Sequence, residues 1–286
     1  MSIIKNIQFQ QFINLLLLLY IAYINHTLQT STIFIFSLAL FAVFFEAFLN
    51  YLKEDKIYLS FSAIITAFGI VLMVGWSKAY IPFILVAAAL LQKRFIKIEN
   101  RHIFNPSNFA MIFALTFFYP KALPIVGQVG DEGYILTFVI ALGILILIRA
   151  NRILISLSFI LFYTLLEYFI IGYSDPHFKF SEFVTKFHSI SFIVYILFML
   201  TDPITTPNEN TLQIAFGFVV ALIIVLLDYF VGVHIRNIFI GLFLSSIIFI
   251  PLYRNIENKI QYLLLFFLSI LAVFKILSTK PMFFNM

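Results

Sequence analysis

The stretch Arg101-His102-Ile103-Phe104-Asn105-Pro106-Ser107-Asn108-Phe109 interrupts a hydrophobic chain with amides and a proline. Pro106 lacks an N–H and has a restricted φ, so it suits the first turn of a helix. Asn105 is a natural N-cap, and the serine and asparagine after the proline add hydrogen-bonding groups at the same end. The stretch therefore predicts a polar start to the apolar helix that follows at residues 110–118.

A second stretch, Phe198-Met199-Leu200-Thr201-Asp202-Pro203-Ile204-Thr205-Thr206-Pro207-Asn208, has a similar pattern, with an acid before the proline. An apolar helix follows it from about Thr211. In hydrocarbon, polar groups must find partners inside the protein. The two stretches therefore suggest one buried polar site; the alternative is two ordinary capped helix starts at the water interface.

The composition identifies the class of protein. The chain has 286 residues, of which 63% are hydrophobic and 11% charged, and its mean hydropathy is +1.06. A soluble domain is nearer half apolar and a quarter charged. The sequence therefore predicts an all-α, polytopic membrane protein, with residues 1–286 as a single transmembrane domain. Because there is no cysteine, disulfides and cysteine-held iron–sulfur clusters are excluded within this chain.

Apolar runs between polar breaks predict ten or eleven membrane spans, since a helical span needs about 20 apolar residues. The first run is expected to be retained as a span, because no small-residue cleavage site follows it. The eleven candidate segments are residues 7–25, 33–52, 57–76, 79–92, 104–119, 134–148, 153–172, 186–200, 212–230, 238–253 and 260–277.

The distribution of basic residues predicts the orientation, because cytoplasmic loops are rich in Lys and Arg. With a cytoplasmic N-terminus, eleven basic residues fall inside: Lys5, Lys53, Lys56, Lys93, Arg94, Lys97, Arg101, Arg149, Arg152, Arg254 and Lys259. Six fall outside: Lys78, Lys121, Lys179, Lys186, Arg236 and Lys280. This map makes residues 104–119 a complete short crossing of about 24 Å, since a re-entrant hairpin would place Arg149 and Arg152 outside. The net charge of +5 fits basic cytoplasmic loops better than nucleic-acid binding.

Three acids lie within predicted spans, where charge is costly and often functional: Glu46, Glu167 and Asp228. Each is a candidate for an ion or proton path, with an interfacial side chain that reaches water as the alternative. The five histidines show no metal-ligand spacing, so the sequence predicts no metal site.

The order of these motifs resembles the RnfD/NqrB family over roughly residues 60–254. The resemblance rests on Phe104-Asn105-Pro106, on the run 198–203, and on Gly127-x-x-Gly130-Asp131-Glu132 before a span that ends in Arg149 and Arg152. The amino-acid sequence of residues 102–109 is more similar to a divergent, UnbU-like branch of that family.

The resemblance implies a multi-pass subunit of an electron-transfer complex in the bacterial inner membrane, in contact with other membrane subunits. Such subunits carry FMN on the threonine of a Ser-Gly-Ala-Thr motif in a periplasmic loop. The corresponding loop, 120–133, contains neither serine nor threonine, and the motif occurs nowhere in the chain. The expected cofactor is therefore a noncovalent FMN or riboflavin, or a cofactor of a partner subunit.

The resemblance and the polar stretches together suggest site residues. The expected cofactor-binding residues are Asn105, Ser107, Asn108, Asp131, Glu132 and Thr201, with Thr205 beside them. The expected ion or proton path contains Asp202, Glu46 and Glu167. Two other functions remain open at this point: a cofactor-free transporter or channel for a small solute or ion, and a structural membrane anchor for partner subunits. The sequence assigns no catalytic residue.

Overall fold

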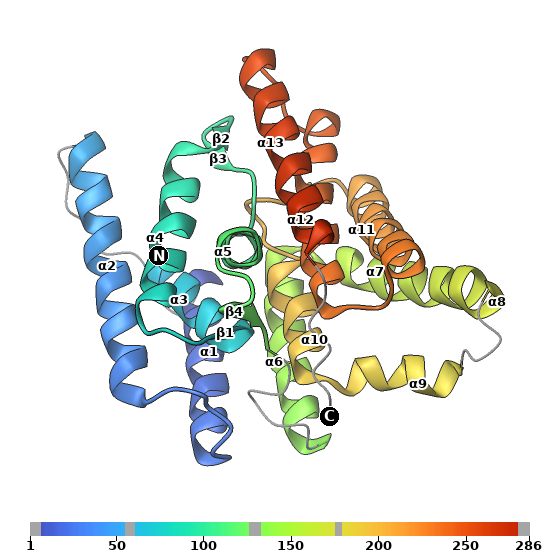
Figure 1. Cartoon of the computed structure of the whole chain (residues 1–286), viewed down its shortest axis with the longest axis horizontal. Helices are drawn as coiled ribbons and strands as arrows, with labels where there is room; N and C mark the ends of the chain where they lie inside the picture. Colours follow the sequence, from blue (N-terminus) through green and yellow to red (C-terminus); the bar gives the residue numbers. More distant parts are fainter. Residues whose placement is uncertain (1–6, 55–60, 126–132, 175–178, 280–286) are drawn as a thin grey trace.

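The computed structural model describes residues 7–54, 61–125, 133–174 and 179–279, and these are mostly helical (Figure 1). All eleven predicted apolar segments are helical over most of their described length. The all-α prediction is therefore confirmed.

The N-terminal part contains five of these helices and two short sheets. Its elements are α1 (Ile7–Ile24), α2 (Thr32–Glu54), α3 (Phe61–Met73), β1 (Val74–Trp76), α4 (Tyr80–Phe95), β2 (Lys97–Ile98), β3 (Arg101–His102), α5 (Pro106–Phe117) and β4 (Ala122–Pro124). Strand β1 pairs antiparallel with β4, and β2 pairs with β3 in a small hairpin.

The C-terminal part is helical, and two of its helices continue into π-helical turns. Its elements are α6 (Gly133–Ala150), α7 (Ile153–Leu166), the π turn η2 (Glu167–Ile171), α8 (Gly172–Ser174), α9 (Phe180–Thr185), the 3₁₀ turn η3 (Lys186–His188), α10 (Ile190–Val194), the π turn η4 (Tyr195–Met199), α11 (Asn210–Val231), α12 (Ile235–Ile248), the 3₁₀ turn η5 (Ile250–Leu252) and α13 (Lys259–Ser278).

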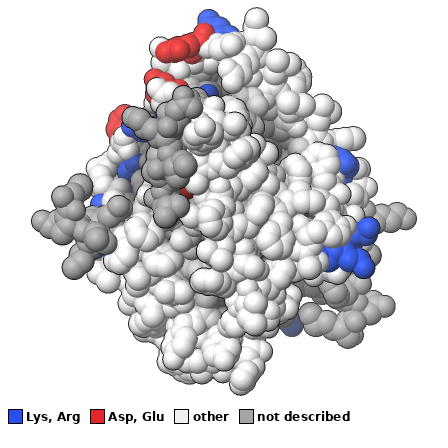
Figure 2. Space-filling view, turned by 90° about the vertical axis from the view of Figure 1, so that its left-hand side faces the viewer, with Lys and Arg blue, Asp and Glu red and all other residues white. Residues whose placement is uncertain are grey.

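Seven helical segments in the described part are long and apolar enough to cross a membrane. They are Ile7–Ile24, Thr32–Leu52, Gly133–Ala150, Ile153–Ser174, Asn210–Val231, Ile235–Leu252 and Lys259–Ser278. The face in Figure 2 carries few charged side chains, and these lie near its edges. An apolar surface of this kind suits contact with lipid, so the chain is a multi-pass membrane protein.

Helix α5 is shorter than predicted. It has 12 residues, which correspond to about 18 Å against a hydrocarbon core of about 30 Å. The helix ends at Phe117 because the chain then turns into β4, which pairs with β1; the last three residues of the predicted 57–76 span thus form a strand. Helix α5 is therefore too short for the complete membrane crossing that the sequence predicts for residues 104–119.

Helix α5 also lies at the centre of the molecule. Figure 1 shows it end-on, between α1–α4 on one side and α7 and α11–α13 on the other. It packs against α3, α4, α12 and α13. This position brings the polar start of α5 into contact with chain segments from both sides.

The closest helix contact in the C-terminal part is between α7 and α11, at Gly217. A Cβ atom at Gly217 would lie 2.0 Å from Ser158 Oγ, 2.8 Å from the Ile155 carbonyl oxygen and 2.9 Å from the Phe159 nitrogen. Small residues let membrane helices approach in this way. Two of the three neighbours are backbone atoms, so a larger side chain would push the helices apart.

We expect Gly217→Ala to lower the free energy of unfolding by about 1–3 kcal/mol, the usual cost of overpacking. The matched control is Gly133→Ala, because a Cβ there meets nothing within 4 Å. Thermal unfolding in detergent, followed by circular dichroism, compares the two. Equal midpoints for both variants would contradict the close α7–α11 contact.

Candidate functional site

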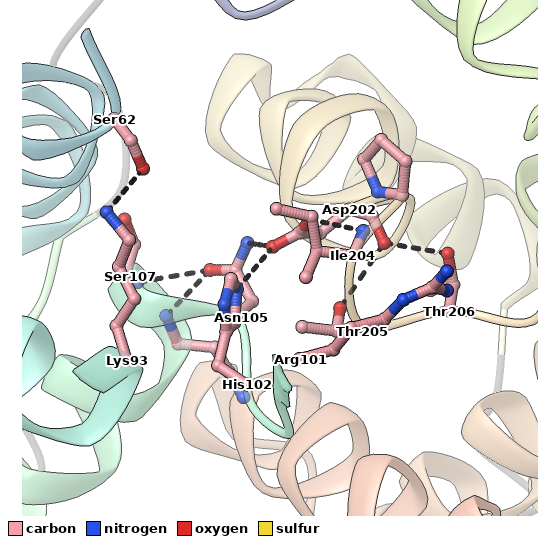
Figure 3. Close-up of polar contacts among 12 residues, drawn as sticks. Ser62, Lys93, Arg101, His102, Asn105, Ser107, Asp202, Ile204, Thr205 and Thr206 are labelled. Atoms are coloured by element: carbon pink, nitrogen blue, oxygen red, sulfur yellow. Dashed lines mark hydrogen bonds and ion pairs between the residues drawn. The ribbon is translucent and has the colours of Figure 1, made fainter. Parts of the chain in front are cut away.

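The two polar stretches meet in the structure. Asn105 Nδ2 donates a hydrogen bond to Asp202 Oδ2 at 3.2 Å, although the residues lie 97 positions apart (Figure 3). His102 Nε2 lies 3.7 Å from the same carboxylate oxygen, a distance for an ion pair and too long for a hydrogen bond. The two stretches are therefore in contact, and their role as one functional site stays a prediction.

Asn105 has two roles at the start of α5. Its Oδ1 accepts from the backbone N–H groups of Ser107 and Asn108, both at 3.1 Å, so it is the predicted N-cap. Pro106 occupies the first turn, as expected from its missing N–H. Because the oxygen is used for capping, the amide nitrogen is left to point at Asp202.

Asp202 lies in a turn that follows η4 and precedes α11. Its Oδ1 accepts from the Ile204 N–H at 3.0 Å, and its carbonyl oxygen accepts from the N–H groups of Thr205 and Thr206, both at 3.1 Å. The N-cap of α11 is Glu209, whose side chain makes no capping bond. The second stretch is thus a self-bonded turn seven residues before the helix cap, and not a helix start like the first.

The surroundings of Asp202 favour its charged form. Burial raises the pKa of this carboxyl, but the neighbouring His102, the Ile204 N–H and the Asn105 amide together hold the pKa below its ordinary value. Asp202 is therefore ionised at neutral pH, at the junction of the N-terminal and C-terminal parts.

Two cavities meet at this junction. The inner cavity has a volume of about 140 Å³ and is mainly apolar, with Leu72, Phe198 and Met199 in its wall. Its polar lining includes His102, Asn105, Ser107 and Asp202 from the two stretches, together with Gln8, Gln11, Ser62 and Thr66.

The outer cavity is larger and basic. Its volume is about 620 Å³, and it is lined by Lys93, Arg94, Lys97, Arg101 and Arg152, with Glu46 as the acid among them. The two cavities share His102, Pro203 and Ile204 in their walls. Sequence reasoning missed this cavity, because the positive-inside rule predicts the side of the membrane on which a basic residue lies. It does not predict which basic residues lie near one another.

The other predicted cofactor residues have different places. Asn108 is fully buried and donates to the Phe239 carbonyl of α12 at 3.3 Å, and Thr201 donates to the Leu197 carbonyl at 2.8 Å. Neither lines the inner or the outer cavity, whereas Ser107 lines the inner one. Asp131 and Glu132 lie outside the described residues.

Glu46 and Glu167 are both paired with lysines, but at different places. Glu46 forms an ion pair with Lys93 in the wall of the outer cavity, and Lys93 also donates to Ser62 at 2.8 Å. Glu167, only 1% exposed, pairs with Lys186 at 2.6 Å in a separate cluster. The three predicted ion-path acids are therefore not brought together.

The Glu167 cluster also contains Asp228, the third acid predicted within a span. Lys186 Nζ lies 4.0 Å from Asp228 Oδ2 and donates to the Tyr163 hydroxyl at 3.1 Å. Asn237 Nδ2 donates to Asp228 Oδ1 at 2.6 Å. Lys186, which the sequence places on the outer side at the start of the predicted span 186–200, is the shared cationic partner of two buried carboxylates.

Comparison with known proteins agrees with the resemblance found in the sequence. Residues 123–239 match the NQR2, RnfD, RnfE family, a shorter range than the 60–254 expected. The matched segment contains Asp202 but not Asn105, and the assignment to a UnbU-like branch stays a prediction. No curated protein matches the chain. Residues 123–239, which run from β4 into α12, are therefore similar to the NQR2, RnfD, RnfE family, within a chain that is a multi-pass membrane protein.

Proposed function

We propose that the protein is a membrane subunit of an electron-transfer complex that works with a noncovalent flavin or with a partner's cofactor. The observation that carries this proposal is the Asn105–Asp202 contact, which joins two sequence motifs where the inner and outer cavities meet. An ionised carboxylate with few solvent contacts can hold a proton or cation that accompanies an electron. The family match of residues 123–239 supports the same class of function.

A flavin fits only one of the two cavities. The inner cavity, at about 140 Å³, is close to the engineered cavity of about 150 Å³ that holds a benzene molecule. A three-ring flavin is much larger than benzene, so the inner cavity does not fit it. The outer cavity, at about 620 Å³, is within the usual range for small-molecule pockets, about 300–1,000 Å³.

The residues of this chain have defined tasks in the proposal. The basic side chains of the outer cavity would hold an anionic cofactor there, and a flavin would supply one- and two-electron chemistry. His102 and Asn105 keep Asp202 oriented and charged at the entrance to the inner cavity. The Glu46–Lys93 ion pair lies in the wall of the outer cavity, and on the proposed ion path the Glu46 carboxylate would exchange its lysine partner for a passing cation.

The test is a flavin assay on the detergent-purified protein. We expect a visible flavin absorption spectrum and, after acid precipitation, flavin fluorescence in the supernatant. Fluorescence retained in the pellet would contradict the noncovalent attachment, since acid does not break a covalent link of this kind. A colourless protein that also fails to bind added FMN or riboflavin would overturn the flavin part of the proposal.

A second function is favoured by the wall that the two cavities share. Because the inner and outer cavities both border His102, Pro203 and Ile204, a small solute or ion could pass from one to the other. Liposome swelling discriminates between the functions: a channel admits solute with no electron donor present, and an electron-transfer subunit does not.

A further inference from the structure

The outer cavity has an excess of positive charge. Five basic side chains and one acid line it, which gives a net charge of +4 when His102 is neutral. The acid, Glu46, is paired with Lys93. Arg94, Lys97, Arg101 and Arg152 also line the cavity, and Glu46 is the one carboxylate among the described residues of its wall.

Arg152 contributes a buried charge. The residue lies between α6 and α7 and is only 4% exposed. Its Nε donates to Thr206 Oγ1 at 2.9 Å, and its two terminal nitrogens donate to the carbonyls of Ala150, Asn151 and Pro203 and to Asn208 Oδ1. All of these acceptors are neutral, so the guanidinium is well held but its charge is not balanced by contact with an acid.

Arg101 adds an exposed charge. It belongs to β3 of the small hairpin, and among the described residues no carboxylate forms an ion pair with it. Burial lowers the pKa of Arg152, the charge of Asp202 raises it in part, and the charge of Arg101 lowers it; Arg101 also contributes to the lowered pKa of Arg254. Arg101 thus repels both Arg152 and Arg254, and arginine does not relieve such repulsion by losing its proton.

We propose that the outer cavity is a binding site for a phosphomonoester group. Arg101 and Lys97 at its wall can contact the phosphate oxygens directly, while the buried charge of Arg152 stabilises the anion from behind. Guanidinium groups match phosphate in charge and in planar hydrogen-bond geometry. A bound anion offsets the electrostatic repulsion among the arginines, which otherwise destabilises the fold around the cavity.

Two molecules could bring this group: a soluble phosphorylated compound from the aqueous side, or a phospholipid headgroup from the bilayer. Both have the same anionic chemistry, and the cavity volume of about 620 Å³ admits either. The site does not depend on electron transfer, because binding of phosphate alone is measurable without a cofactor or a partner.

The first experiment compares thermal unfolding of the full chain in detergent with inorganic phosphate and with chloride at equal ionic strength. We expect phosphate to raise the unfolding midpoint by about 2–4 °C at about five times its dissociation constant. Arg101→Gln should remove most of this shift and, because Arg101 is exposed, leave the fold intact. The control is Lys259→Gln, which removes an exposed basic residue outside the cavity wall and should keep the full shift.

The second experiment identifies the source. FMN and riboflavin share a ring system and differ by the phosphate, so FMN should bind about tenfold or more tightly if the ligand is soluble, and Arg101→Gln should abolish the difference. If the ligand is a lipid, the unfolding midpoint should instead be higher in nanodiscs that contain phosphatidic acid than in nanodiscs of phosphatidylcholine alone. Arg101→Gln should remove this difference. The proposal would be overturned if phosphate and chloride gave the same unfolding midpoint, FMN bound no more tightly than riboflavin, and phosphatidic acid raised the midpoint no more than phosphatidylcholine. This outcome would count against the phosphate site even if the protein binds riboflavin and transfers electrons. Should the Arg101 variant fail to fold, the wild-type comparisons decide.

Discussion

Asp202→Asn should lower the proposed electron transfer by about a hundredfold or more, the usual scale for losing a proton-handling group, which is the role proposed for Asp202. The variant keeps the shape of the side chain but loses its charge. It also has one acceptor oxygen in place of two. Because Ile204 N–H and Asn105 Nδ2 each need an acceptor at this side chain, one of them must lose its partner. The measurement is the rate of donor-to-acceptor electron transfer by the purified complex.

The matched control for this prediction is Glu209→Gln. Glu209 is an exposed acid in the same interhelical segment, and its side chain makes no capping bond to α11. The Glu209→Gln variant should leave the rate of electron transfer unchanged. Full activity of the Asp202 variant at normal expression would remove this carboxylate from the mechanism, and an equal loss in both variants would show an effect of loop charge alone.

Much of the local structure near the site follows from the sequence, because caps and prolines act over a few residues. Asn105 and Pro106 start α5 at the predicted place. The meeting of Asn105 with Asp202 was also predictable, because polar groups within a membrane chain need protein partners. By contrast, the end of α5 depends on the pairing of β1 with β4, a contact between segments far apart in the chain that an apolar run does not reveal.

The parts that sequence reasoning missed are contacts between charged residues on different elements. The positive-inside rule gave Lys93, Arg101 and Arg152 a side of the membrane, but the shared cavity arises only when α4, β3 and the α6–α7 connection are packed together. One signal was available for Lys186. Glu167 and Asp228 in predicted spans each need a partner, and Lys186 begins the predicted span 186–200.

Lys186→Met should produce the largest loss of stability among single variants in the C-terminal part, about 3–5 kcal/mol. Methionine fills a similar volume but removes the positive charge that Glu167 and Asp228 share. These acids are 1% and 5% exposed, so neither can exchange the lysine for water. The free energy of unfolding, from thermal or denaturant unfolding in detergent, measures the loss. Lys121→Met, at an exposed lysine outside this cluster, should be nearly neutral.

A double variant separates lost charge balance from lost packing. Glu167→Gln in the Lys186→Met background removes the carboxylate that lies 2.6 Å from the lysine, and Asp228 keeps its hydrogen bond from Asn237 at 2.6 Å. We therefore expect the double variant to recover more than half of the stability that Lys186→Met loses, since an unpaired buried charge costs more than a neutral amide in the same place. If the two changes instead add their separate losses, the lysine acts through packing against Tyr163 and Phe183, over whose rings its ammonium lies at 5.5 and 5.2 Å. In that case the cluster would be a structural contact, and Glu167 would lose its place on the proposed ion path.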